Sequence, residues 1–139
     1  MRLRRLLLLG LVLLLAACRS QTGPAPLETD PDGTLRVGAC LPLEGPLAPC
    51  GEGVRAAMAL AVARVNAAGG VMGSRLRLLV EDTGGDPEHS ARAARKLLYG
   101  EGVVALLGGA TSVEALAIAP VCQAAGVPMV TGTATTPEL

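Results

Sequence analysis

The sequence predicts an α/β fold built on a parallel β-sheet, with its elements in the order βαβαβαβ. Short apolar runs alternate along the chain with longer segments in which apolar residues recur at helical spacing. The run from Val103 to Leu107 is wholly apolar, as expected for a central parallel strand that is covered on both faces. Turns rich in glycine or proline separate these segments, so each strand can cross over to the next through a helix.

The first half of the domain is expected to run strand, helix, strand. Residues 35–41 form the first strand, and residues 42–51 form a loop dense in glycine and proline. A helix is expected over 52–68, because apolar residues recur there on one face. These residues are Val54, Met58, Ala61, Val62 and Val65. Gly69 follows the helix, and the second strand, 75–82, alternates before it becomes apolar.

The second half continues with two helices and two strands. Asp86 suits a helix N-cap and Pro87 suits the first helical position. Pro120 is expected to bend the last helix, and Gly126 to end it. The expected elements are a helix at 87–99, a strand at 103–107, a helix at 112–125, a short strand at 127–131 and a polar loop at 132–137.

The turn after the strand at 103–107 is a candidate anion site. Gly108 and Gly109 permit a tight turn and the close approach of a ligand to the backbone. Thr111 and Glu114 have the spacing of a capping box, so a helix should start there. Its first N–H groups, together with the hydroxyl of Ser112, could hold a carboxylate or a phosphate. An ordinary capped connection would have the same sequence, and both interpretations stay open.

Hydroxyl side chains gather at one edge of the predicted sheet. Ligands of open parallel α/β sheets bind outside the carboxyl ends of the strands. The loops expected at that edge are 42–51, 83–86, 108–111 and 132–136. The last two loops and the adjoining helix start contain Thr111, Ser112, Thr133, Thr135 and Thr136. This grouping favours a small polar ligand that carries a carboxylate.

Residues 1–17 have the pattern of a bacterial lipoprotein signal peptide. A basic segment precedes an apolar run, 6–15, that is too short to span a bilayer comfortably. Leu15-Ala16-Ala17-Cys18 resembles a lipobox, in which Cys18 would receive a lipid that tethers the protein to a bacterial membrane. A plain secretory signal with an incidental cysteine is the alternative. Both place the mature protein outside the cytoplasm, in the periplasm or at the cell surface, and residues 18–34 are expected to be a flexible tether.

Other functional classes have little support in the sequence. The 12 basic and 12 acidic residues balance, and Tyr99 is the single aromatic residue, so nothing indicates binding to nucleic acid. His89 is the single histidine, and no nucleophile elbow, Walker loop or dinucleotide fingerprint is present, so neither catalysis nor a cofactor is expected. The spacing of Glu81, Asp82 and Asp86 matches no calcium loop, so no metal site is expected.

Three cysteines follow Cys18 in the sequence. Cys40 and Cys50 flank one loop, and a disulfide between them is one alternative for a protein outside the cytoplasm. Cys122 lies in an apolar helical segment and is expected to be a small buried residue.

Taken in order, four segments of the chain resemble the branched-chain amino-acid-binding proteins, which are type 1 periplasmic solute-binding proteins of ABC importers. The segments are LPLEGPLA at 41–48, VNAAGGVMG at 65–73, the pairs ED and DP within 81–87, and TATTPEL at 133–139. The resemblance covers residues 35–139 and implies a fold of two α/β lobes that close on a ligand. Residues 35–139 would be the N-terminal part of the first lobe.

The resemblance also implies roles for individual residues. Ser112 would bind the ligand's α-carboxylate through its hydroxyl and backbone N–H. Thr133 would offer its backbone carbonyl to the α-ammonium, and Thr135 its hydroxyl to the α-amino-acid group. Thr111 and Ala110 would line the pocket through their backbone.

Cys50 would lie at the pocket edge, where many relatives have an aromatic or large apolar residue. This difference weakens any inference about which ligand side chain the pocket prefers. The acid of the second lobe that usually pairs with the ammonium has no counterpart in this sequence.

The resulting hypothesis is a lipid-anchored binding protein that captures an amino acid, branched-chain or related, for an ABC permease. The alternative is the ligand-sensing domain of a receptor or regulator with the same lobe fold. The lipobox favours the first, because a sensor would normally need a membrane-spanning helix and a signalling domain. Two lobes of ordinary domain size need roughly 300 residues, so the 139-residue sequence is expected to be a fragment or a truncated product.

Overall fold

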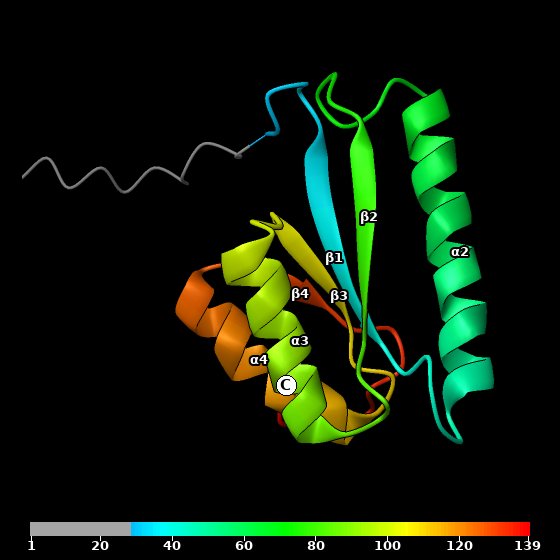
Figure 1. Cartoon of the computed structure of the whole chain (residues 1–139), viewed down its shortest axis with the longest axis vertical. Helices are drawn as coiled ribbons and strands as arrows, with labels where there is room; N and C mark the ends of the chain where they lie inside the picture. Colours follow the sequence, from blue (N-terminus) through cyan, green and yellow to red (C-terminus); the bar gives the residue numbers. More distant parts are fainter. Residues whose placement is uncertain (1–28) are drawn as a thin grey trace, which may run out of the picture.

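The computed structural model describes residues 29–139. The predicted signal peptide, the lipidation site at Cys18 and most of the predicted tether lie outside these residues. The elements follow one another as β1 (Leu35–Leu41), α2 (Ala48–Ala67), β2 (Leu76–Asp82), α3 (Pro87–Arg95), the π-helical segment η1 (Lys96–Gly100), β3 (Ala105–Gly108), α4 (Ser112–Ala125) and β4 (Met129–Val130) (Figure 1).

The four strands form one sheet in the order β2-β1-β3-β4, and every pairing is parallel. Leu35 pairs with Leu76 and Leu41 pairs with Asp82, so β1 and β2 match along their whole length. β3 pairs with the other side of β1, and β4 pairs with β3. The α/β class and the parallel βαβαβαβ order predicted from the sequence are therefore confirmed. The carboxyl ends of the strands meet at one edge of the sheet.

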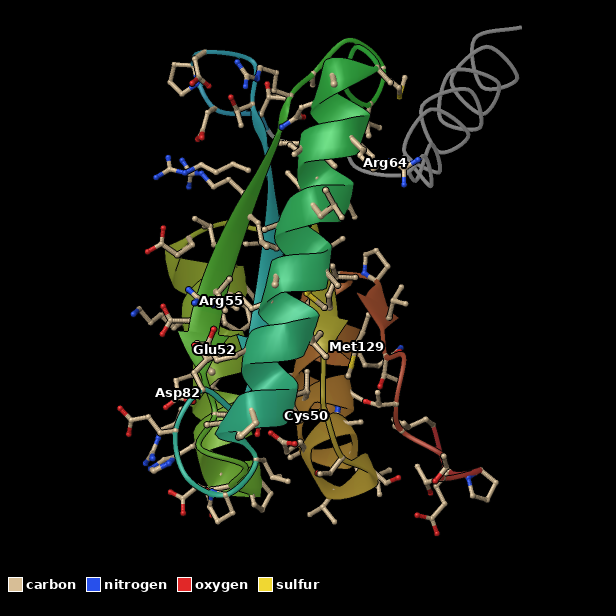
Figure 2. The ribbon with its side chains drawn as sticks, turned by 90° about the vertical axis from the view of Figure 1, so that its right-hand side faces the viewer. Cys50, Glu52, Arg55, Arg64, Asp82 and Met129 are labelled. Carbon is tan, nitrogen blue, oxygen red and sulfur yellow. The ribbon has the colours of Figure 1, made fainter. Side chains whose placement is uncertain are left out.

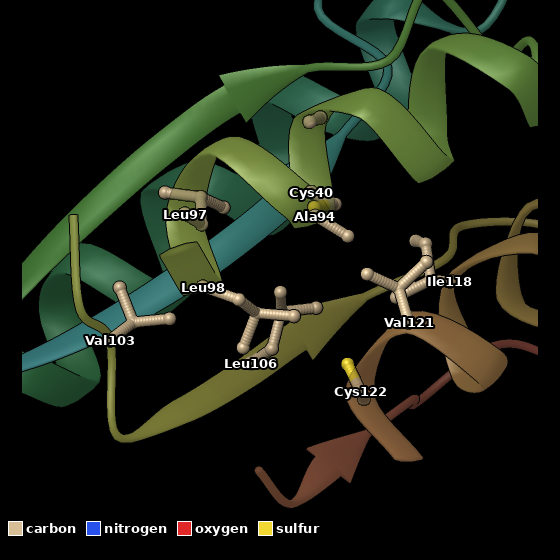
Figure 3. Close-up of a cluster of buried hydrophobic side chains, with 10 residues drawn as sticks. Cys40, Ala94, Leu97, Leu98, Val103, Leu106, Ile118, Val121 and Cys122 are labelled. Atoms are coloured by element: carbon tan, nitrogen blue, oxygen red, sulfur yellow. The ribbon is translucent and has the colours of Figure 1, made fainter. Parts of the chain in front are cut away.

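Helices cover both faces of the sheet (Figures 1 and 2). α2 lies alone on one face, against β1 and β2, whereas α3, η1 and α4 pack together on the other. The main core lies beneath α3 and α4 and consists of aliphatic side chains and thiols (Figure 3). Its largest fully buried aliphatic residues are Leu97, Leu106 and Ile118. Each contributes about 1.5–3 kcal/mol by leaving water.

α2 begins at Ala48 rather than at the predicted Glu52. Pro49 suggested a loop, but proline is tolerated in the first helical turn, where its missing N–H would have no helical partner. The helix ends at Ala67, close to the predicted end. Of the predicted apolar face, Val54, Met58, Val62 and Val65 are half-buried, whereas Ala61 is exposed.

The segment between α3 and β3 differs from the prediction. The helix predicted over 87–99 is α-helical only to Arg95, and it continues as η1, in which Leu97 and Leu98 are both buried. The strand begins at Ala105 rather than at Val103. The reason is that the N–H of Val103 donates to the carbonyl of Leu97 at 3.2 Å and so still closes the preceding helical segment.

α4 has the predicted bounds, and Gly126 ends it with a left-handed φ of 67°. β4 is only Met129–Val130, shorter than the predicted 127–131. The N–H of Val127 donates to the carbonyl of Cys122 at 3.1 Å, and Pro128 has no N–H to donate. Neither residue can therefore donate to a neighbouring strand.

The three cysteines within residues 29–139 are free thiols. Cys40 is buried in the core beneath α3 and α4, whereas Cys50 is exposed on α2 at the other face of the sheet, so the disulfide considered between them does not form. Cys122 is buried, as predicted. Burial raises the pKa of Cys40 to about 12, so this side chain stays a protonated thiol.

Gly51 fixes the first turn of α2 against the loop that follows β1. A Cβ at Gly51 would lie 1.8 Å from the carbonyl oxygen of Pro42, whereas a Cβ at Gly53 would meet nothing within 4 Å. In the full-length protein, Gly51→Ala should lower the free energy of unfolding by about 1–3 kcal/mol through this overlap. Gly53→Ala in the same helix should raise it by up to about 1 kcal/mol, because alanine favours helix more than glycine. Urea unfolding measures both, and equal effects of the two substitutions would contradict the close packing at Gly51.

Candidate functional site

Two glycines bring the start of α4 close to the end of β1. Gly108 has φ 144°, and a Cβ there would lie 2.3 Å from the carbonyl oxygen of Cys40. Gly109 has φ 76°, and a Cβ there would lie 2.7 Å from the Cα of Ala115. A side chain at either position would collide with backbone atoms, so only glycine permits this turn. The first turn of α4 is thereby placed at the carboxyl edge of the sheet.

The predicted capping box at the start of α4 is confirmed. The hydroxyl of Thr111 accepts the N–H of Glu114 at 3.3 Å, and the carboxylate of Glu114 accepts the N–H of Thr111 at 3.0 Å. The first-turn N–H groups of Ser112 and Val113 have no backbone acceptor within the described part of the chain. They carry the partial positive charge of the helix start and are available to a bound anion.

The carboxylate of Glu114 is fully buried, with 0% of the residue exposed. Its Oε1 atom accepts the hydroxyl of Thr83 at 2.5 Å and lies 3.5 Å from the hydroxyl of Ser90. Its Oε2 atom accepts both the N–H and the hydroxyl of Thr111 at 3.0 Å. No lysine, arginine or histidine of residues 29–139 forms an ion pair with it. Hydrogen bonds and the helix start therefore stabilise this carboxylate without a neighbouring cation.

Two neighbouring residues fix the loop that follows β2. Thr83 is fully buried, and its N–H donates to the carbonyl of Leu41 at 2.9 Å. The carboxylate of Asp82 accepts the N–H of Leu43 at 2.6 Å and that of Gly84 at 3.0 Å. Partial burial acts to raise the pKa of Asp82, but these backbone hydrogen bonds outweigh it and hold the pKa below its ordinary value. The loops after β1 and β2 are thus bound to each other.

The loop after β4 lies against the start of α4. The carbonyl of Gly109 accepts the hydroxyls of Thr131 at 3.1 Å and Thr133 at 3.3 Å. The N–H of Thr135 donates to the hydroxyl oxygen of Ser112 at 3.2 Å. The structure therefore brings Ser112, Thr133 and Thr135 together, as the sequence predicted.

A mainly apolar cavity of about 200 Å³ opens at the same edge, on the face that α2 covers. Two of the predicted site residues, Ala110 and Thr133, line it. Further lining comes from Leu41, Val54, Met58, Leu107, Gly108, Gly109, Val130 and Gly132. A pocket of this kind suits the apolar side chain of a ligand whose polar groups bind at the start of α4.

Two predicted site residues, Thr111 and Cys50, do not line this cavity. The hydroxyl and the N–H of Thr111 are both engaged with Glu114 in the capping box, and its predicted backbone role in binding remains a prediction. Cys50 is exposed in the first turn of α2, at the end of the helix where Figure 2 also shows Glu52. The cavity is lined from α2 by Val54 and Met58 instead of Cys50. A role for Cys50 in binding remains a prediction.

The acidic residues at this edge already have partners. Glu81 pairs with Lys96 at 2.7 Å, and Asp86 accepts the N–H of His89 at 2.8 Å as the N-cap of α3. Within residues 29–139, no group of three or more potential ligands could hold a metal ion. In the same part of the chain, every helix is too short or too polar to cross a membrane.

The sequence did not reveal the network around Glu114. The Thr-x-x-Glu spacing indicated a cap but not that the carboxylate is buried. Thr83 and Ser90 lie 31 and 24 residues away in the sequence and reach it from the loop after β2 and from α3. No local pattern connects Thr83 or Ser90 with Glu114, so the sequence offered no signal for this contact.

Within residues 29–139, the carboxyl edge of this parallel α/β sheet has two helix N–H groups without a backbone acceptor, a cluster of hydroxyls and an apolar cavity. An edge with these features is typical of a small-molecule binding domain. The model of the periplasmic binding protein family matches residues 34–139. The chain belongs to this family, whose members bind solutes and are not enzymes.

Similar proteins agree with this assignment. The Leu/Ile/Val-binding protein BraC3 of Rhizobium johnstonii is 36% identical over 105 residues, which are 76% of this chain and 28% of that protein. The branched-chain amino acid transporter substrate-binding protein LivJ of Streptococcus pneumoniae, solved with isoleucine, matches with a TM-score of 0.73 and 30% identity, over 76% of this chain and 30% of LivJ. A solute-binding protein of Rhodopseudomonas palustris BisB5, solved with 3,4-dihydroxybenzoic acid, matches with a TM-score of 0.68 and 28% identity, over 75% and 28% of the two chains. The chain thus spans less than a third of the length of these relatives.

The hydroxyl of Thr83 should be important for stability. Thr83→Val keeps the shape of the side chain but removes the 2.5 Å donor to buried Glu114. We expect the free energy of unfolding of the full-length protein to fall by about 1–3 kcal/mol, because a buried carboxylate oxygen loses a partner. Thr136→Val is the control, since that hydroxyl bonds only to nearby, exposed Glu138. Equal losses in urea unfolding would contradict a special role for Thr83.

Proposed function

We propose that this protein captures an amino acid, branched-chain or related, outside the cytoplasm and delivers it to an ABC permease. The observation that carries the proposal is the family match over 34–139, which contains all four loops at the carboxyl edge of the sheet. The names of BraC3 and LivJ support this ligand class, and the ligand of LivJ is isoleucine. A second lobe would close over the ligand and supply its remaining contacts.

The ligand's carboxylate would bind at the start of α4. Because the Ser112 oxygen accepts the N–H of Thr135, the hydroxyl proton of Ser112 remains free to donate to that carboxylate. The N–H groups of Ser112 and Val113 would complete the contacts. The hydroxyl of Thr133 is directed to Gly109, which leaves the backbone carbonyl of Thr133 for the ligand's ammonium.

The ligand's side chain would enter the apolar cavity beside α2. Val54 and Met58 line it from the helix, and Leu107 and Val130 from the sheet. Aliphatic walls of this kind favour an aliphatic ligand side chain, which gains free energy by leaving water. This supports a branched-chain amino acid over a polar one.

A lipid on Cys18 would hold the mature protein at a bacterial membrane. The support is the sequence Leu15-Ala16-Ala17-Cys18 after an apolar run. The first strand of the domain begins at Leu35, so the short polar tether predicted over 18–34 would leave the domain near the membrane surface.

The proposed carboxylate site can be tested at Ser112. In the full-length protein, Ser112→Ala should weaken binding of leucine or isoleucine by about tenfold, because it removes one hydrogen bond to a charged group. Isothermal titration calorimetry measures the change. Ser74→Ala, in the turn at the opposite edge of the sheet, is the matched control and should bind like the unchanged protein. Unchanged affinity in Ser112→Ala would reject the site, and failure of the unchanged protein to bind either amino acid would reject the proposed ligand class.

The proposed lipid anchor can be tested at Cys18. Cells fed radiolabelled palmitate should label the protein and retain it in the membrane fraction. Cys18→Ser should abolish both the label and the membrane retention, because serine provides no thiol for the lipid. Cys50→Ser should change neither, since Cys50 lies in α2 of the folded domain. Labelled, membrane-retained Cys18→Ser would contradict lipidation at this position.

A further inference from the structure

The buried carboxylate of Glu114 lies beside the proposed binding site for the ligand's carboxylate. Its Oε2 atom is 3.0 Å from the backbone nitrogen of Thr111, and the next residue, Ser112, supplies the proposed anion-binding groups. Because Glu114 is 0% exposed, water and salt screen its charge much less than they screen a surface charge. The same helix start would therefore face two carboxylates, one from the protein and one from the ligand.

The contacts of Glu114 are those of an ionised carboxylate. The N–H of Thr111 can only donate, and the hydroxyls of Thr111 and Thr83 each donate to a carboxylate oxygen. Ser90 contributes no further donor, because its hydroxyl proton is donated to the carbonyl of Asp86 at 2.7 Å. The four basic residues that form ion pairs within residues 29–139 pair with other acids. The negative charge of Glu114 is therefore balanced only by hydrogen bonds and by the helix start.

We infer that Glu114 is a specificity-determining residue, which makes the site select zwitterionic α-amino acids over carboxylic acids that lack an amino group. The inference rests on the proposed function, since it assumes a ligand carboxylate at Ser112. A simple carboxylate at Ser112 brings a second negative charge to the helix turn that holds Glu114, and at an effective dielectric constant of about 20 the repulsion should weaken binding by at least about tenfold. An α-amino acid carries its ammonium next to its carboxylate, so most of this repulsion cancels.

The fold alone does not decide between these two ligand classes. LivJ was solved with isoleucine, and the protein of Rhodopseudomonas palustris was solved with 3,4-dihydroxybenzoic acid, which has no amino group. Both match this chain in structure over about the same share of its length. A buried negative charge next to the start of the binding helix could make one protein of this fold prefer amino acids over carboxylic acids that lack an amino group.

The test compares leucine with 4-methylpentanoate, its analogue without the amino group, by calorimetry on the full-length protein. The unchanged protein should bind leucine at least about tenfold more tightly. Glu114→Gln removes the charge and should reduce this preference by about tenfold or more, by strengthening binding of 4-methylpentanoate. An unchanged preference in Glu114→Gln, or equal binding of both ligands by the unchanged protein, would overturn the inference.

Two further measurements separate the charge of Glu114 from its structural role. Glu114→Asp and Thr83→Ala each disturb the hydrogen-bond network but keep the charge, so the preference for leucine should persist even where both affinities fall. If either variant loses the preference as fully as Glu114→Gln, the inference is wrong. Should Glu114→Gln not fold, the comparison of leucine with 4-methylpentanoate on the unchanged protein still decides, and equal binding of the two ligands would be the contrary result.

The outcomes also distinguish this inference from the proposed function. If leucine and isoleucine both fail to bind the unchanged protein, amino-acid capture is rejected and the inference falls with it. If leucine binds but the preference does not depend on the charge of Glu114, only the inference is rejected.

Discussion

The carboxyl edge of this sheet depends on the burial of one carboxylate, that of Glu114, because three segments converge on it. Thr83 and Thr111 donate three hydrogen bonds to it, and the hydroxyl of Ser90 lies 3.5 Å from it. Thr83 reaches it from the end of β2, Ser90 from α3, and Thr111 from the start of its own helix. A buried charge without these donors would be strongly unfavourable, so the three segments are stable in this arrangement only together. The loop after β1 joins the assembly through Asp82, whose carboxylate accepts the N–H of Leu43.

The two faces of the sheet differ in how densely they are packed. The face beneath α3 and α4 holds the dense core of Leu97, Leu106 and Ile118. On the other face, the apolar stripe of α2 is only half-buried, and the cavity lies between this helix and the end of β3. Stability is therefore concentrated behind the site, whereas the space for a ligand lies on the less filled side. The close contact of Gly51 with Pro42 fixes where α2 stands and so sets one wall of that space.

Features that depend on neighbouring residues could be predicted from the sequence. Features that depend on contacts between residues far apart in the sequence could not. The bounds of α4 follow from the Thr111 cap and from Gly126, which act within one turn. The start of α2 was placed too late because Pro49 fits either a loop or a first helical turn, and only packing decides between them. The grouping of Ser112, Thr133 and Thr135 followed from the parallel sheet, since all three come after strand ends. The burial of Glu114 depends on Thr83 and Ser90, which no local pattern connects with it.

The network around Glu114 places stability and ligand affinity in opposition. The start of α4 has a limited positive potential, and a carboxylate in the capping box already uses part of it to hold the loops in place. A ligand carboxylate at Ser112 must share that potential, so a strongly capped helix binds a bare anion less well than an uncapped one would. A ligand with its own ammonium avoids most of this cost, because its net charge is zero. The interaction that orders the edge of the sheet therefore also restricts the chemistry of the ligand that this edge can accept.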